Sequence, residues 1–119
     1  MEVVLSMMKI EAVIQTSRFE DVREALRGLE IARMFVSEVA SHGGPWAQTL
    51  FYRGSQYQAG APMTKLELLV PAACVDEVVE SISRHARTNL QVDDGSITIS
   101  RLDDAISIRN GSRVEFATL

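Results

Sequence analysis

Residues 9–29 have the sequence KIEAVIQTSRFEDVREALRGL, in which a strand pattern is followed directly by a helix pattern. Apolar and more polar residues alternate over 9–14, which predicts a strand with one apolar face. Ser17 and Glu20 then have the spacing of a capping box, which marks the start of a helix. The helix is expected to end near Gly28, because apolar residues follow helical spacing at Phe19, Val22, Leu26 and Leu29.

The rest of the chain carries a second set of strand and helix patterns. Further strands are expected at 34–40, 65–70 and 96–100, and a short extra strand at 105–109. A second helix is expected to open at Pro71, with one apolar face formed by Val75, Val78, Val79 and Ile82.

The strand–helix–strand order therefore occurs twice, on either side of a long segment at about 41–62. This order predicts an α+β domain of the ferredoxin-like type, a split βαβ arrangement (βαββαβ) with both helices on one face of an antiparallel sheet. If the other sheet face is apolar it must also be covered, which predicts self-association. We expect a single domain at 8–119, preceded by an N-terminal extension at 1–7.

Composition and charge narrow the class of protein. The chain has 12 Lys and Arg residues against 16 Asp and Glu residues, which argues against a broad nucleic-acid-binding face. A few converging cations still suffice for a small anion. The single cysteine, Cys74, favours a reducing compartment, and the first residues lack the basic flank and apolar run of a signal peptide. No run of about 20 apolar residues occurs, so we expect a cytoplasmic protein without a membrane span.

The long segment at 41–62 has neither a strand nor a helix pattern, and it contains four aromatic residues. A patternless segment of this length inside a compact domain is usually functional or disordered. A surface insertion without a role is the alternative, but exposed aromatic residues usually contact something. Tyr52-Arg53-Gly54 and Tyr57, near the middle, are the candidates for contact with a partner.

Two further features indicate an anion site. The turn from Arg87 and Thr88 to Asp94 and Gly95 lies between a helix end and a strand, where glycine lets backbone N–H groups approach an oxyanion. A plain connecting turn is the alternative that the spacing favours. Arg109 lies near the end of the last expected strand. Exposed arginines are normally solvated, so Arg109 is a candidate for an anion site only in combination with other residues.

The sequence gives little support for a catalytic function. Cys74 and His85 are the only pairing that suggests a nucleophile and a base, but they lie three turns apart on one helix, about 16 Å along its axis. No spacing of His, Cys and carboxylates matches a metal site. We therefore expect neither an enzyme nor a metalloprotein, and no cofactor.

Taken together, these motifs resemble the PII family of GlnB- and GlnK-like signal-transduction proteins, of which the chain looks like a divergent member. The resemblance runs from about Met8 to Gly111 and rests on six segments in order. They are KIEAVI at 9–14, FEDVREAL at 19–26, YRGSQY at 52–57, KLE at 65–67, ART at 86–88 with DG at 94–95, and AISIRNG at 105–111.

The resemblance implies a homotrimer with the sheets facing inward and with adenine-nucleotide sites between subunits. The long segment would be the family's T-loop, which docks on a transporter or a metabolic enzyme; any membrane contact would come through a transporter, and no nucleic acid is implied. Tyr57 matches a residue that is modified by uridylylation in some members. The nucleotide-site positions carried over by match are Gly43 and Leu69 from one subunit and Thr88, Asp94, Gly95 and Arg109 from its neighbour, with Arg87 close by.

Departures from the family pattern alter the expected ligand. Ser96 and Ser107 replace a lysine and an arginine that face phosphate, and Met63 replaces the lysine that holds 2-oxoglutarate. Other substituted positions are Gly44, Pro45 and Asn89. Each lost cation removes a charge-assisted contact of about 1.5–3 kcal/mol, so we expect ADP or AMP to bind in preference to ATP. The chain also resembles divergent relatives that serve inorganic-carbon uptake and respond to bicarbonate.

Three alternatives remain open from the sequence. One is a trimeric docking scaffold of the same family that has lost nucleotide binding. Another is an RNA-binding RRM domain, which shares the βαββαβ order, but the strands at 65–70 and 96–100 carry no aromatic residue for base stacking. An enzyme on this topology would need a convergent acid–base pair, and the sequence offers none. The target protein, and the choice between nitrogen and carbon regulation, do not follow from the sequence.

Overall fold

The computed structural model describes residues 6–41, 48–52, 55–59, 61–89 and 94–113. Strands β1, β2, β5 and β6 and helices α1 and α2 form one body, and β3 and β4 form a separate hairpin. The bounds are β1 Met7–Gln15, α1 Phe19–Leu26, β2 Arg33–Ser41, β3 Gln48–Tyr52, β4 Ser55–Ala59, β5 Ala61–Pro71, α2 Val75–Ala86 and β6 Gly95–Arg101, with 3₁₀ turns at Thr16–Arg18 and Ala72–Cys74.

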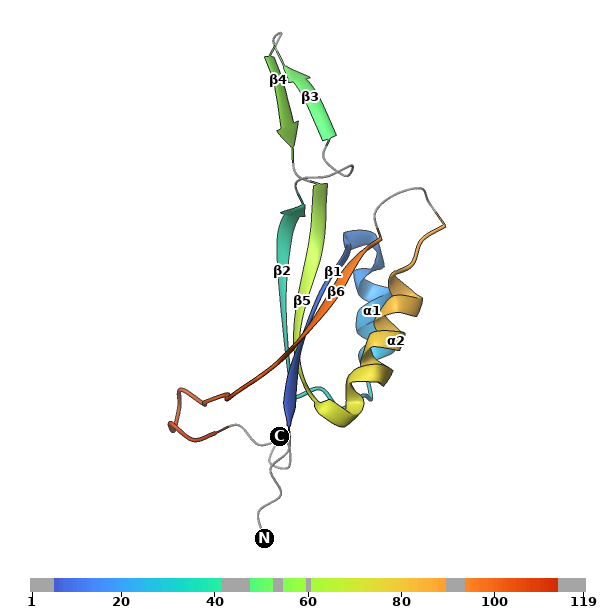
Figure 1. Ribbon diagram of the computed structural model, residues 1–119. Coiled ribbons are helices and arrows are strands. Elements are labelled where there is room, and N and C mark those ends of the chain that lie inside the picture. Colours follow the sequence, from blue (N-terminus) through green and yellow to red (C-terminus); the bar gives the residue numbers. More distant parts are fainter. Residues whose placement is uncertain (1–5, 42–47, 53–54, 60, 90–93, 114–119) are drawn as a thin grey trace.

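The four-stranded sheet has the order β2-β5-β1-β6, and each neighbouring pair is antiparallel. Both helices lie on one face of this sheet, and the other face is left open by the described part of the chain (Figure 1). This is the predicted ferredoxin-like split βαβ arrangement, so the expected fold class is confirmed, and the strands expected at 9–14, 34–40, 65–70 and 96–100 are present. Neither helix in the described ranges is long and apolar enough to cross a membrane.

The core lies between the sheet and the two helices, as the alternation in the strands predicts. Residues opposite each other on β1 and β5 point to the same face, so their apolar positions gather on the helix side. Val22 of α1, and Val78 and Ile82 of α2, close this layer and are fully buried. The buried cluster consists of Ile10, Ala12, Ile14, Val22, Leu26, Leu66, Leu68, Val70, Val78, Ile82 and Ala86.

Both helices begin differently from the expectation. The capping box does not form: Ser17 lies inside a 3₁₀ turn, no side chain caps α1, and Glu20 instead accepts a hydrogen bond from Arg23 at 2.6 Å. Pro71 does not open α2 but ends β5, where it pairs with Met7, and α2 follows a second 3₁₀ turn. In each case the 3₁₀ turn reverses the chain between strand and helix, which moves the helix start downstream.

The segment expected to be patternless contains ordered strands. Strand β2 extends to Ser41 and β5 begins at Ala61, so the connection between them is shorter than 41–62 at both ends. Within it, β3 and β4 pair in antiparallel register from Gln48 with Ala59 to Tyr52 with Ser55. This hairpin extends beyond the end of the sheet formed by β2 and β5 (Figure 1).

The expected strand at 105–109 does not form. The segment instead folds back on itself: Ile106 makes an isolated bridge with Arg113, and the Gly111 N–H donates to the Ser107 carbonyl at 2.8 Å. Alternating isoleucines predict a strand only where a partner strand is available, and within one chain this segment leads away from the sheet (Figure 1). Ile106 is 61% exposed and Ile108 is fully exposed.

Candidate functional site

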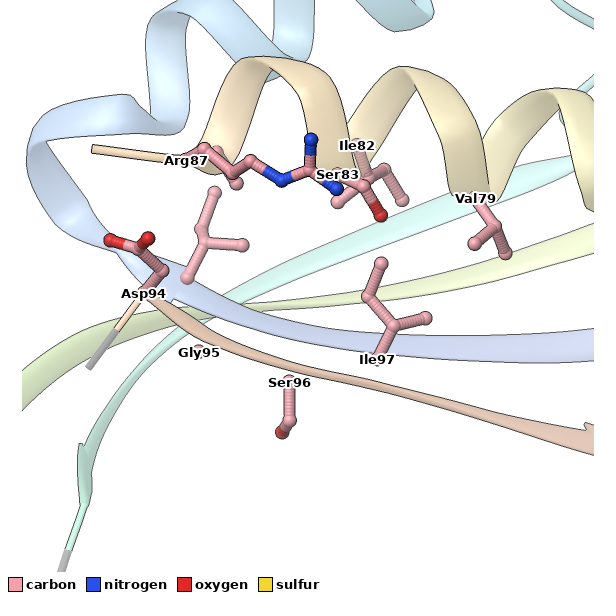
Figure 2. A pocket seen from close by; sticks show the side chains of 10 residues that line it. Val79, Ile82, Ser83, Arg87, Asp94, Gly95, Ser96 and Ile97 are labelled. Atoms are coloured by element: carbon pink, nitrogen blue, oxygen red, sulfur yellow. The ribbon is translucent and has the colours of Figure 1, made fainter. Parts of the chain in front are cut away.

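A cavity of about 360 Å³ lies between the C-terminal half of α2 and the start of β6. Five apolar side chains form most of its wall, and Ser83, Arg87 and Asp94 supply polar groups at one end. Figure 2 shows Ile97 pointing up from β6 toward α2, whereas Ser96 points away from the helix. The full lining is Ile14, Val79, Ile82, Ser83, Ala86, Arg87, Asp94, Gly95, Ser96 and Ile97. Its volume is within the range of small-ligand pockets.

Thr88 and Asp94 close the turn at the polar end of this cavity. One Asp94 carboxylate oxygen accepts hydrogen bonds from both the Thr88 hydroxyl, at 2.6 Å, and the Thr88 backbone N–H, at 3.2 Å. These bonds join the end of α2 to the start of β6 across residues 90–93, which lie outside the described residues. The carboxylate therefore fixes the shape of the turn, and Arg87 brings a positive charge to the same end.

Gly95 has a structural role that the sequence did not reveal. Its φ is +110°, and a Cβ placed on it would lie 1.7 Å from the backbone oxygen of Val13. Only glycine allows β6 to start so close to β1, whose Ile14 is its partner in the register. Gly95 is thus required by the packing of two strands, whether or not a ligand binds at the turn.

A second cavity, of about 370 Å³, lies at the end of β1 where the long connection meets β5. Met63 contributes to it and is almost completely buried, and Thr64 beside it donates a hydrogen bond to Thr16 at 3.0 Å. The residues that line it are Gln15, Thr16, Ser17, Glu38, Pro62 and Met63. Of these, only Met63 was connected with a ligand from the sequence, although several of them lie at strand ends next to the long segment, where binding residues often occur.

The remaining predicted site residues lie elsewhere. Leu69 pairs with Lys9, five positions along β1 from the Ile14 of the first cavity, or about 17 Å away. Arg109 follows the far end of β6, which is about 20 Å from Gly95. Within one chain, therefore, the structure brings together Arg87, Thr88, Asp94 and Gly95 but separates them from Leu69 and Arg109.

The candidates in the long connection are described only in part. Tyr52 ends β3 and Tyr57 lies in β4, opposite Leu50. Gly43, Arg53 and Gly54 lie outside the described residues.

Arg113 forms an ion pair with Asp104 in the C-terminal segment. Its Nε donates to Asp104 at 2.9 Å, and this hydrogen bond lowers the pKa of the Asp104 carboxyl. Arg109 lies between these two residues in the sequence. The pair therefore closes the turn that presents Arg109.

Cys74 and His85 have separate partners, in keeping with their expected separation. The Cys74 thiol contacts Glu30 at 3.9 Å, and burial, reinforced by the Glu30 charge, raises the pKa of the thiol. A raised pKa leaves less of the thiolate form that nucleophilic chemistry requires. The His85 ring bonds to the Ser81 carbonyl at 2.8 Å, and the His85 carbonyl accepts from Arg18 at 2.9 Å.

The fold and the arrangement of these segments define a ferredoxin-like domain with a long inserted connection between its second and third sheet strands. The family described as nitrogen regulatory protein P-II matches residues 7–112, and the chain belongs to this PII family. Relatives named nitrogen regulatory protein P-II from Haemophilus influenzae and Rhodobacter capsulatus are 38% and 37% identical over 112 residues. Nitrogen regulatory protein P-II 1 from Escherichia coli (strain K12) is also 38% identical over 112 residues. Each alignment covers 93% of this chain and 99% of the relative.

A solved structure shares the fold. The GlnK–ATP complex of B. subtilis superposes with a TM-score of 0.68 at 23% identity, over 91% of this chain and 94% of that one. The resemblance to the PII family is confirmed by the family match over residues 7–112 and by the relatives at about 38% identity.

Replacing Gly95 by alanine tests the strand-packing role of this glycine. Gly95→Ala is expected to lower the free energy of unfolding by at least about 2 kcal/mol more than Gly28→Ala, measured by chemical denaturation. Gly28 is a matched control because it also has a positive φ, of 90°, but a Cβ there meets nothing within 4 Å. Equal losses for the two variants would contradict the proposed close approach.

Proposed function

We propose that this protein is a trimeric PII-type regulator that binds an adenine nucleotide between subunits and controls a transporter or a metabolic enzyme through its long connection at 42–60. The observation that carries the proposal is the separation of the candidate site residues. Arg87, Thr88, Asp94 and Gly95 cluster at one end of the sheet, and Leu69 lies about 17 Å away. A site that uses both groups has to be assembled from more than one chain.

Two exposed surfaces support assembly. The sheet face opposite the helices is uncovered by the described part of the chain (Figure 1). The C-terminal segment presents Ile106 and Ile108, at 61% and 101% exposure, on a turn that is ordered by the pair of Asp104 and Arg113. Exposed apolar side chains on an ordered projection favour contact with another molecule.

The residues that line the two cavities favour a nucleotide with less negative charge than ATP. Ser96, which lines the first cavity, stands where relatives of this type are expected to carry a lysine, and its side chain points away from α2 (Figure 2). The second cavity contains the carboxylate of Glu38, and no Lys or Arg occurs among the described residues that line it. We therefore propose that ADP or AMP binds better than ATP and that 2-oxoglutarate adds little; bicarbonate is a further ligand to test.

The open sheet face also bears on the RNA-binding alternative. The central strands of the sheet are β1 and β5, and residues 96–100 belong to the edge strand β6. The open face of the central strands carries Lys9, Glu11, Lys65 and Glu67. A cluster of ion pairs offers no platform for base stacking, so this alternative has no support from the structure.

Light scattering tests the assembly. The protein is expected to have the mass of three chains at micromolar concentration, because the candidate site needs residues from different chains. A monomer across that range would contradict the intersubunit site.

Calorimetry with ADP, AMP and ATP tests the ligand. We expect ADP or AMP to bind more tightly than ATP, since Ser96 and Ser107 replace two phosphate-facing cations. The titrations are repeated with 2-oxoglutarate and with bicarbonate present. Tight ATP binding that 2-oxoglutarate strengthens would contradict the preference, and a trimer that binds no nucleotide would favour the scaffold alternative.

Replacing Arg109 tests its assignment to phosphate. Arg109→Ala is expected to weaken ADP binding by about tenfold to a hundredfold, the equivalent of about 1.5–3 kcal/mol for a charge-assisted contact. Arg113→Ala is expected to have a smaller effect, arising only from the loss of the Asp104 pair. Arg27→Ala, which removes an exposed arginine at the C-terminal end of α1, is the control that should leave affinity unchanged. Equal affinities for all three variants would remove Arg109 from the site.

A further inference from the structure

The 3₁₀ turn at Thr16–Arg18, which joins β1 to α1, lies beside the end of α2. The two helices run in opposite directions over the sheet, so the start of α1 and the end of α2 lie at the same end of the helix layer (Figure 1). Arg18, the last residue of the turn, donates a hydrogen bond from its Nε to the His85 carbonyl at 2.9 Å. This bond joins two residues that are 67 positions apart in the sequence.

The His85 carbonyl needs a partner from outside its helix. The last four carbonyls of an α-helix have no intrahelical N–H from which to accept, and α2 ends at Ala86, one residue after His85. Many helices close with a glycine in the left-handed conformation, but Arg87, which follows α2, is extended, with φ of −64° and ψ of 140°. Arg18 therefore caps a helix end that does not close in this way. Its positive charge also lies at the negative end of the helix dipole.

The Arg18 side chain is itself held in place from two directions. Its Nη1 lies 3.1 Å from the carboxylate of Asp21, in the first turn of α1. The 3₁₀ turn that carries Arg18 is bonded to the sheet, because the buried Thr64 of β5 donates to the Thr16 hydroxyl at 3.0 Å. The guanidinium therefore has a fixed base, and the end of α2 is positioned against it.

The capped end of α2 leads directly into the candidate site. The residues that the proposed nucleotide site uses at this end, here called the anion turn, are Arg87, Thr88, Asp94 and Gly95. Thr88 follows His85 by three positions, which is at most about 11 Å of chain. A shift of the helix end therefore displaces Thr88 and strains its two hydrogen bonds to Asp94.

We propose that Arg18 is a positioning residue for the anion turn, because it fixes the end of α2 from which the turn continues. Arg18 is not among the residues that line either cavity, so its effect on a ligand passes through the helix end. The inference rests on the proposed nucleotide site and adds to it a residue that does not touch the nucleotide. Because the acceptor is a backbone carbonyl, replacing the His85 side chain does not remove it.

A role in stability alone predicts a different result from a role in positioning. The pair of Arg18 and Asp21 is partly exposed, at 32% and 58%, and such pairs add little to the stability of a chain. A contact that only stabilises the fold changes the opening of all protected amides together, whereas a local cap acts on the last turn of its helix and the residues that follow. The amide of Thr88 therefore reports positioning, and the amide of Ile82, in the middle of α2, reports general stability.

Amide hydrogen exchange of the nucleotide-free protein, followed by NMR, tests the inference. Arg18→Met keeps the aliphatic part of the side chain but removes its donors and its charge. We expect the Thr88 amide to exchange at least about fivefold faster in this variant, while the Ile82 amide keeps its rate. Arg18→Lys keeps the charge and one donor group, so its Thr88 rate should lie between those of the parent and Arg18→Met.

Arg84→Met is the matched control, because it removes a cation next to His85 that pairs with Glu80 of the same helix. It should leave the Thr88 rate unchanged. Titration of ADP into the same variants measures the consequence for the ligand. Arg18→Met is expected to weaken ADP binding by about threefold to tenfold, as for residues that act on a site without touching its ligand, and Arg84→Met should leave it unchanged.

Two results in the exchange experiment would overturn the inference and leave the nucleotide site standing. One is equal acceleration of the Thr88 and Ile82 amides, and the other is a Thr88 rate in Arg18→Met no faster than in Arg84→Met. Faster Thr88 exchange together with the parental affinity for ADP would also overturn it. A parent that binds no nucleotide would overturn the proposed site, and the exchange rates alone would then decide whether Arg18 fixes the turn.

Discussion

The antiparallel pairing of β1 with β5 determines where the other strands of the main sheet and the two helices lie. The register runs unbroken from Met7 opposite Pro71 to Gln15 opposite Met63. Because side chains alternate along each strand, this one alignment sends most of the aliphatic residues of both strands toward the helices and their lysines and glutamates to the other side. The edge strands β2 and β6 attach to this central pair, and α1 and α2 cover the aliphatic side that it creates. The pairing of β1 with β5 therefore determines both the buried core on the helix side and the charged groups of Lys9, Glu11, Lys65 and Glu67 on the open side.

Patterns that depend on neighbours in sequence predicted most of this fold. Alternation located β1, β2, β5 and β6, and helical spacing located α1 and α2 with their buried faces. The errors arose where a strand depends on a distant or weakly specified partner. The hairpin of β3 and β4 is connected through Arg53-Gly54, which is a weaker hairpin signal than Asn-Gly, and its strands are largely polar. The segment at 105–109 has the alternation of a strand but finds no partner strand within the described chain.

The candidate site was predictable residue by residue but not as an arrangement. Thr88 and Asp94 are close in sequence, and a short turn brings them within hydrogen-bonding distance. Leu69 and Arg109 were matched to the same kind of site, yet the length of a strand separates each from that turn. Sequence also left the purpose of Gly95 open, since the contact that requires glycine is made with Val13, on a strand more than eighty residues earlier. Such contacts follow from topology and are invisible to local patterns.

The strict register of β1 and β5 also limits how this sequence can change in evolution. Inserting or deleting a single residue within either strand would turn its aliphatic set toward the open face and its charges into the core. Descendants of this chain can therefore vary in length only between strands and helices, whereas substitutions within the central pair have to preserve the alternation. Divergence in ligand and target is thus directed to the connections, and the sheet is inherited with its spacing intact.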